Sequence, residues 1–149
     1  MGCLFIYISM ITKIQSVSDI ITNSSSEAFV MTKQDAKYYE DVESDGCIDV
    51  FPITMDWLAK DGRWEWEMVC SICDLDPTEV QGEYHKDRYF SYYDGPDEET
   101  WETFLELHKD VIEERIKDLY WVDIEDHFAD AASVTDSARS DALWHDYRH

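Results

Sequence analysis

The longest regular pattern of apolar and polar positions covers about residues 96–120, where apolar residues recur every three or four positions. Pro96 suits the first turn of a helix, because its missing N–H costs nothing there. Acidic residues at 97–99 favour the positive end of the helix dipole. We therefore expect one long amphipathic helix, whose apolar side is formed by Trp101, Phe104, Leu105, His108, Val111, Ile112, Arg115, Ile116 and Leu119.

Alternation of apolar and polar residues predicts strands elsewhere in the chain. The clearest case is 64–72, where Glu65, Glu67 and Ser71 would share one face and the intervening apolar residues the other. Shorter strands are expected at 28–31, 47–53 and 121–128. Pro52 favours a sheet edge or a strand end for the second of these, because proline cannot donate a backbone hydrogen bond.

Helix-capping residues complete the pattern. Thr32 can cap a helix over about 33–42, and Thr54 can cap a shorter one that ends near Lys60. A final helix is expected over 136–147. Together, the predicted strands and helices indicate an α+β fold with a mostly antiparallel sheet packed against the long helix (about 96–120) and shorter helices. At 149 residues, we expect one domain over 1–149.

The net charge of the chain narrows its possible partners. Asp and Glu number 34 against 12 Lys and Arg, a formal net charge of -22. Residues 1–33 are balanced, so the excess belongs to the rest of the chain, where aromatic residues are interleaved with the acids. Direct binding of nucleic acid or of an anionic membrane is disfavoured, because both need clustered basic residues. No apolar run approaches the length of a membrane span.

The predicted long helix carries a stripe of carboxylates on its polar side. On a continuous helix, side chains three or four positions apart lie about 5–6 Å apart, a spacing comparable to that of phosphates along a DNA strand. Such a stripe could bind a basic protein surface, including that of a DNA-binding protein. The alternative is a solvated helix face, partly neutralised by Lys109 and Lys117. The stripe consists of Glu99, Glu102, Glu106, Asp110 and Glu113.

Four cysteines are present, and without a recognisable secretory signal we expect them to be reduced and intracellular. Cys70 and Cys73 form a C-x-x-C pair, which is a weak metal-site candidate. Zinc would need two more ligands, and Cys47, His85 and His108 lie nearby only at irregular spacing. Two plain core cysteines are the simpler interpretation.

The sequence contains no residue pattern that is typical of a catalytic site. Pairs of acids can be drawn almost anywhere among 34 carboxylates, so no pair is informative. A phosphate-cradling glycine loop and an activated-serine motif are both absent from the sequence. We expect no catalytic residue and no cofactor. A metal-dependent enzyme that uses acidic clusters with His85 or His127 is kept as an alternative.

Residues 19–30 read DIITNSSSEAFV. This segment resembles an N-terminal signature, D-[FILV]-[VI]-T-N-S-S-S-x-x-F-[VI], of small uncharacterised proteins of bacteria and their tailed phages. The resemblance implies a natural start at Met10, with 1–9 as an upstream extension, and it transfers no activity. The signature's polar part can form a tight turn between two strands, or it can display a recognition tag. That part is Thr22, Asn23, Ser24, Ser25 and Ser26.

These observations together predict a non-catalytic acidic binding protein of phage or mobile-element origin, in the cytoplasm of a bacterial host. It would act on a basic protein, and one specific form is a DNA mimic that blocks a host nucleic-acid-binding or defence protein. The alternatives are a virion-associated structural or cargo protein, and the metal-dependent enzyme.

Overall fold

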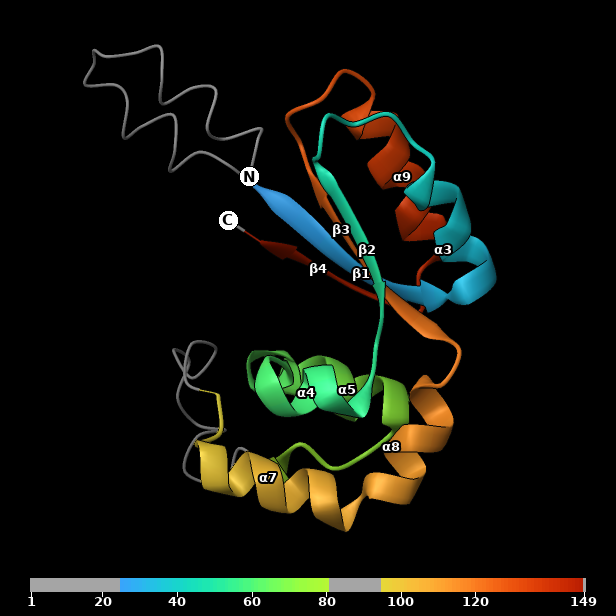
Figure 1. Cartoon of the computed structure of the whole chain (residues 1–149). Helices are drawn as coiled ribbons and strands as arrows, with labels where there is room; N and C mark the ends of the chain where they lie inside the picture. The colour runs from blue at the N-terminus through green and yellow to red at the C-terminus, as the bar shows by residue number, and fades with distance from the viewer. Residues whose placement is uncertain (1–24, 81–94, 149) are drawn as a thin grey trace, which may run out of the picture. The chain divides into compact units, whose positions relative to one another are not determined.

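The computed structural model describes residues 25–80 and 95–148 of the chain (Figure 1). The chain divides into two compact units. Unit 1 combines Met1–Pro52 with Leu119–His149, and unit 2 is Ile53–Asp118. Unit 2 is thus an insertion within the sequence of unit 1. Whether the chain behaves as the expected single domain stays a prediction.

Unit 1 contains a four-stranded antiparallel sheet in the order β2-β3-β1-β4. Within unit 1 the elements follow one another as β-α-β-β-α-β, and together with this strand order they form the split βαβ arrangement called ferredoxin-like. The expected α+β class and antiparallel sheet are confirmed. The elements are β1 (Ser26–Thr32), α3 (Lys33–Glu40), β2 (Ile48–Pro52), β3 (Leu119–Glu125), α9 (Ala131–Asp141) and β4 (Trp144–Arg148).

The helices α3 and α9 pack on one face of this sheet (Figure 1). β1 is a central strand, and its residues 28–31 are completely buried, as expected of a continuous apolar run between two neighbouring strands. Pro52 lies at the end of the edge strand β2, in agreement with the predicted sheet edge or strand end. The core between sheet and helices comprises Phe29, Met31, Ala36, Tyr39, Val122, Ile124, Val134 and Ala138.

Tyr39 joins the two helices of unit 1. Its hydroxyl donates to Oδ2 of Asp141 at 2.9 Å and lies 3.0 Å from Oγ of Ser137, both on α9. Burial, with the Asp141 carboxylate beside it, raises the pKa of Tyr39 to about 12. The ring therefore stays neutral and the hydroxyl keeps its donating hydrogen.

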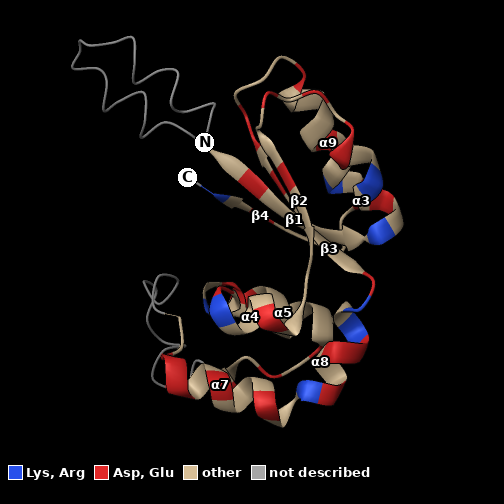
Figure 2. Cartoon of the chain, in the orientation of Figure 1, with Lys and Arg blue, Asp and Glu red and all other residues tan. Residues whose placement is uncertain are grey.

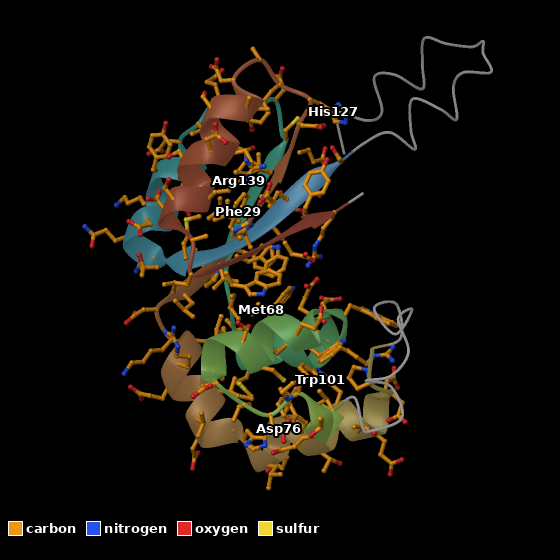
Figure 3. The ribbon with its side chains drawn as sticks, turned by 180° about the vertical axis from the view of Figure 1, so that it is seen from behind. Phe29, Met68, Asp76, Trp101, His127 and Arg139 are labelled. Carbon is orange, nitrogen blue, oxygen red and sulfur yellow. The ribbon has the colours of Figure 1, made fainter. Side chains whose placement is uncertain are left out.

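Unit 2 is helical in the residues that the structure describes. Its elements are α4 (Met55–Lys60), η1 (Gly62–Glu65), α5 (Trp66–Cys73), α7 (Glu98–Leu107) and α8 (Lys109–Ile116). Trp101 is 1% exposed, and its Nε1 donates to the carbonyl oxygen of Leu58 at 2.8 Å (Figure 3). Its ring stacks on that of Phe104 with centroids 5.5 Å apart. Trp101 thus holds α7 against α4.

Both predicted threonine caps are confirmed. Thr32 Oγ1 accepts from the backbone N–H of Asp35 at 3.2 Å, at the start of α3. Thr54 Oγ1 accepts from the N–H of Trp57 at 3.1 Å, at the start of α4. In each case the hydroxyl satisfies an N–H group that the first turn of a helix leaves without a backbone partner.

The strand expected at 64–72 is wrong, because this segment forms η1 and α5. Glu67 and Ser71, the exposed positions of α5, lie four residues apart. A spacing of four fits a strand face and a helix face equally well. The intervening residues are buried on several sides of the helix, and this removes the periodicity that distinguishes the two structures.

The single long helix over 96–120 is not confirmed, because α7 and α8 are separated at His108. The axis of α8 turns away from that of α7 (Figure 1). His108 Nε2 lies 2.6 Å from Oε1 of Glu79, and its ring packs on Phe104. The break between the helices coincides with this tertiary contact. The sequence around His108 contains no proline or glycine from which the break could be predicted.

The final helix expected at 136–147 is displaced. α9 begins earlier, at Ala131, and ends at Asp141, and β4 follows it. Ala142 already has extended backbone angles, φ -76 and ψ 144. Pairing of β4 with β1 supplies hydrogen bonds that the local pattern does not reveal.

Replacing Trp101 by alanine should destabilise the fold by about 3–5 kcal/mol, the usual cost of removing a buried aromatic side chain. The variant also loses the hydrogen bond from the indole to the Leu58 carbonyl. Urea unfolding followed by circular dichroism measures the change. Leu107→Ala is the control, because Leu107 is 70% exposed and should change stability by less than about 0.5 kcal/mol. Equal losses in the two variants would contradict the described core.

Candidate functional site

The structure places the predicted acidic stripe on two helices. Glu99, Glu102 and Glu106 lie on α7, and Asp110 and Glu113 lie on α8. All five side chains are exposed. The spacing of a continuous helix holds within each helix but is interrupted at His108. We call these five residues the α7–α8 acidic surface, and Figure 2 shows acidic bands along both helices.

Few basic residues accompany the α7–α8 acidic surface. Lys117 Nζ lies 3.1 Å from Oε2 of Glu114, an exposed pair that contributes little to stability. Arg115 Nε donates to the carbonyl oxygen of Ile72 at 2.7 Å, so this guanidinium is held toward α5. The N-cap Asp97 accepts from the N–H of Thr100 at 2.7 Å, and this hydrogen bond lowers the pKa of Asp97. The start of α7 therefore carries a firmly ionised carboxylate.

Cys70 and Cys73 are free thiols on α5, and both are buried. Burial raises the pKa of Cys70 to about 12 and that of Cys73 to about 11. Thiols of this kind stay protonated and are poor nucleophiles. Among residues 25–80 and 95–148, no group of three or more His, Cys, Asp or Glu side chains is arranged to hold a metal ion.

Cys47, which is buried beside β2, is disulfide-bonded. The expectation that all four cysteines are reduced is therefore wrong for Cys47 and holds for Cys70 and Cys73. Spacing along a sequence does not predict a disulfide, because the bond depends on which cysteines the fold brings together.

Only the end of the signature falls within the described residues. Thr22, Asn23 and Ser24 lie outside them, as does Met10, so the predicted turn and start site stay predictions. Ser25 precedes β1, and Ser26 is the first residue of this central strand. Ser25 Oγ donates to Oδ2 of Asp126 at 2.6 Å, which ties the start of β1 to the residue following β3.

A cleft of ≈ 470 Å³ opens in unit 1 where β1 starts. We call it the β1–α9 cleft, because its walls are the first residues of β1, the segment that follows β3, and α9. Ile124, Phe128 and alanines of α9 supply apolar lining, and Tyr147 of β4 completes it. Its polar lining residues are Ser25, Ser26, Glu27, Asp126, Thr135, Asp136 and Arg139.

Glu27 is the buried charge of this cleft, with a side chain only 5% exposed. Arg139 Nε donates to both of its carboxylate oxygens at 3.1 Å, and Arg139 Nη2 donates to Oε1 at 2.8 Å. His145 Nδ1 lies 2.8 Å from Oε2. Burial opposes ionisation, but the hydrogen bonds and charges of Arg139 and His145 outweigh it and lower the pKa of Glu27. Glu27, Arg139 and His145 form what we call the Glu27 ion cluster; Arg139 is labelled in Figure 3.

The opposite face of the sheet carries a second unusual carboxyl group, that of Asp123 on β3. Burial raises its pKa to about 6; Arg148 counteracts this effect, while the carboxylates of Glu125 and Asp49 reinforce it. Its Oδ1 is buried and has no hydrogen-bond partner among the described residues. Asp49 is its cross-strand neighbour in the β2–β3 register. Two adjacent acids on one sheet face disfavour each other's ionisation.

The spacing of the acids along the sequence predicts the exposed carboxylates of α7 and α8, whereas no sequence pattern predicts the β1–α9 cleft. Glu27 stands near the end of the signature and could have been noticed as an acid within an apolar strand. Arg139 and His145 come from elements more than a hundred residues away in sequence. No local pattern pairs such distant residues.

No protein-family model, no curated protein and no solved structure matches this chain. Fold alone does not specify function, because ferredoxin-like sheets carry many unrelated activities. Any functional conclusion therefore depends on the surfaces described above.

Replacing Glu27 by glutamine should cost about 2 kcal/mol of stability near neutral pH, the usual range for a buried hydrogen bond to a charged group. The lowered pKa of Glu27 means that its contribution is present above the ordinary value of 4.5 and is lost as pH falls through the folded-state value. Urea unfolding at about pH 7 and about pH 3 should show the difference shrinking in acid. Exposed Glu40→Gln serves as the control, and a deficit independent of pH would refute the ionic role.

Replacing Asp123 by asparagine should have the opposite pH dependence. Because the folded-state pKa is raised from 3.8 to about 6, the stability gained from the neutral form is complete below 3.8 and is lost as pH rises through about 6. The variant should therefore be more stable than the wild type at about pH 7.5, with the difference diminishing near pH 4. Urea unfolding at several pH values measures this, with exposed Asp118→Asn as the control. An advantage that grew in acid would contradict the assignment.

Proposed function

We propose that this chain is a non-catalytic acidic binding protein whose α7–α8 acidic surface engages a basic protein surface. The observation that carries the proposal is the exposure of all five carboxylates on two consecutive helices of a chain with a net charge of -22. Such a charge opposes compaction through self-repulsion, and it attracts and orients basic partners.

A protein that binds nucleic acid is the class of partner that this surface would suit, because such proteins present clustered Lys and Arg to phosphates. The break at His108 divides the carboxylates into two short tracks of different direction. Because no single track runs along both helices, we base the proposed binding on the complementary charge of the two surfaces. A more specific hypothesis is that the acidic surface competes with DNA for the partner's DNA-binding surface. The resemblance of residues 19–30 to a signature of bacterial and tailed-phage proteins supports a partner in a bacterial host.

The remaining findings are compatible with this role. No helix in the described ranges has the length and apolarity needed to span a membrane. The buried thiols of α5 have raised pKa values, which does not suit nucleophilic catalysis. The proposal assigns catalysis to none of the described residues.

Affinity capture from bacterial lysate at low and at moderate salt tests the proposal. The wild type should retain basic, nucleic-acid-binding proteins at low salt and lose most of them as salt rises, because the attraction is screened. Reversing Glu102, Glu106 and Asp110 together to lysine should reduce capture by about tenfold or more. Added duplex DNA should compete if the captured proteins use their DNA-binding surfaces.

The matched control reverses three exposed acids of unit 1, Glu40, Asp41 and Glu43, to lysine. Both triple variants change the net charge equally, so only the α7–α8 variant should lose binding. Equal losses in the two variants would mean that overall charge, not this surface, recruits the partner. Retention of no basic protein by the wild type at low salt would overturn the proposal itself.

A further inference from the structure

We infer that the β1–α9 cleft is a binding site for a small organic cation, namely a guanidinium or alkylammonium group on a short apolar stem. This inference is independent of the proposed function. It concerns unit 1, whereas the α7–α8 acidic surface belongs to unit 2.

The size of the cleft suits a small molecule. Its volume of ≈ 470 Å³ lies within the range of about 300–1,000 Å³ that is typical of small-ligand sites. All of its lining residues belong to unit 1, so the site is complete within one compact unit.

The charged residues that line the cleft favour a positively charged ligand. Three carboxylates, those of Glu27, Asp126 and Asp136, line the cleft with one guanidinium, that of Arg139. Two imidazoles adjoin these carboxylates: His145 Nδ1 lies 2.8 Å from Glu27 Oε2, and His127 Nε2 lies 3.8 Å from Asp126 Oδ1, so with both imidazoles neutral the excess is negative. Arg139 is already engaged, since it donates to Glu27 and, through Nη1, to Oδ1 of Asp136 at 3.0 Å. An anion would have to displace these contacts, whereas a cation would compensate the excess negative charge.

The apolar residues that line the cleft favour a ligand whose cationic group is attached to a short hydrocarbon stem. Ile124, Phe128, Ala131 and Ala132 offer surface against which a short hydrocarbon stem can be buried. Phe128 and Tyr147 contribute aromatic rings, and guanidinium groups interact favourably with aromatic faces. A bare metal ion would use neither feature.

The polar groups of the cleft are held in place before a ligand binds. The Glu27 ion cluster fixes Arg139 on α9 relative to β1, and the Ser25–Asp126 hydrogen bond fixes the carboxylate at the other wall. Such preorganisation lowers the entropic cost of binding. Ser25, Ser26 and Glu27 are the part of the signature region that lines the cleft, so the inference also gives these residues a role.

Isothermal titration calorimetry of the full chain, at about 0.15 M salt to screen diffuse attraction, tests the inference. The first probe is agmatine, which carries a guanidinium and an ammonium group on a butyl stem. The second is a blocked glycine-arginine-glycine peptide, which presents the same chemistry as a side chain. Agmatine should bind saturably, at one site per chain. Binding of the peptide as well assigns the cleft to arginine side chains of a polypeptide, and binding of agmatine alone assigns it to free cations.

Two variants separate cleft binding from the general attraction of cations to an acidic protein. Ala132→Phe places a ring in the cleft without changing the charge, and Ala132 is an exposed α9 residue, so folding should be preserved. The double change Asp126→Asn and Asp136→Asn removes two lining charges. Each should weaken agmatine binding by about tenfold or more.

The control is Asp41→Asn with Glu43→Gln, which alters the net charge equally outside the cleft lining and should leave binding unchanged. Wild-type affinity in Ala132→Phe would overturn the inference, as would equal losses in the cleft and control double variants. The absence of saturable agmatine binding in the wild type would also overturn it. None of these results bears on capture of basic proteins by the α7–α8 acidic surface, so the two proposals can fail separately.

Discussion

The buried carboxylate of Glu27 is the constraint on which unit 1 is organised. A carboxylate in the interior is tolerated only when its charge is compensated and its oxygens accept hydrogen bonds. The compensation comes from Arg139 on α9 and from His145 on the edge strand β4. One acid of the central strand therefore fixes both a helix over the sheet and an outer strand beside it. The β1–α9 cleft is a consequence, because it lies where these three elements meet.

Acidic residues have two different structural roles in this chain. In unit 1, several of them accept hydrogen bonds that join distant elements, as Asp126 does for Ser25 and Asp141 for Tyr39. On α7 and α8 the acids are exposed and oppose one another. The buried aromatic contacts of Trp101 offset that repulsion by holding α7 against α4. Packing inside unit 2 thus permits a surface charge that does not itself stabilise the fold.

The sequence predicts elements whose signals are local and misses those that depend on distant contacts. Thr32 and Thr54 cap helices because a hydroxyl meets an N–H three residues later, and this is visible in the sequence. The break at His108 coincides with its contact with Glu79, which local periodicity cannot reveal. The exposure of the acids at 99–113 is predictable because their spacing of three or four residues is local, although the predicted continuous stripe is interrupted at His108. The cleft was missed because Glu27 and Arg139 are 112 residues apart.

The position of unit 2 in the sequence explains how acids that join elements of unit 1 coexist with exposed, mutually repelling acids on α7 and α8. It is inserted between β2 and β3, two antiparallel neighbours that a short hairpin loop could otherwise join. The register of β3 against β1 and β2 holds the two ends of the insertion on adjacent strands, so the sheet does not depend on the composition of what lies between them. The members of the unit 1 core and of the Glu27 ion cluster all come from unit 1, whereas the carboxylates of α7 and α8 belong to unit 2. A charge reversal on α7 and α8 therefore alters exposed residues of unit 2, while every hydrogen bond of the Glu27 ion cluster is made within unit 1.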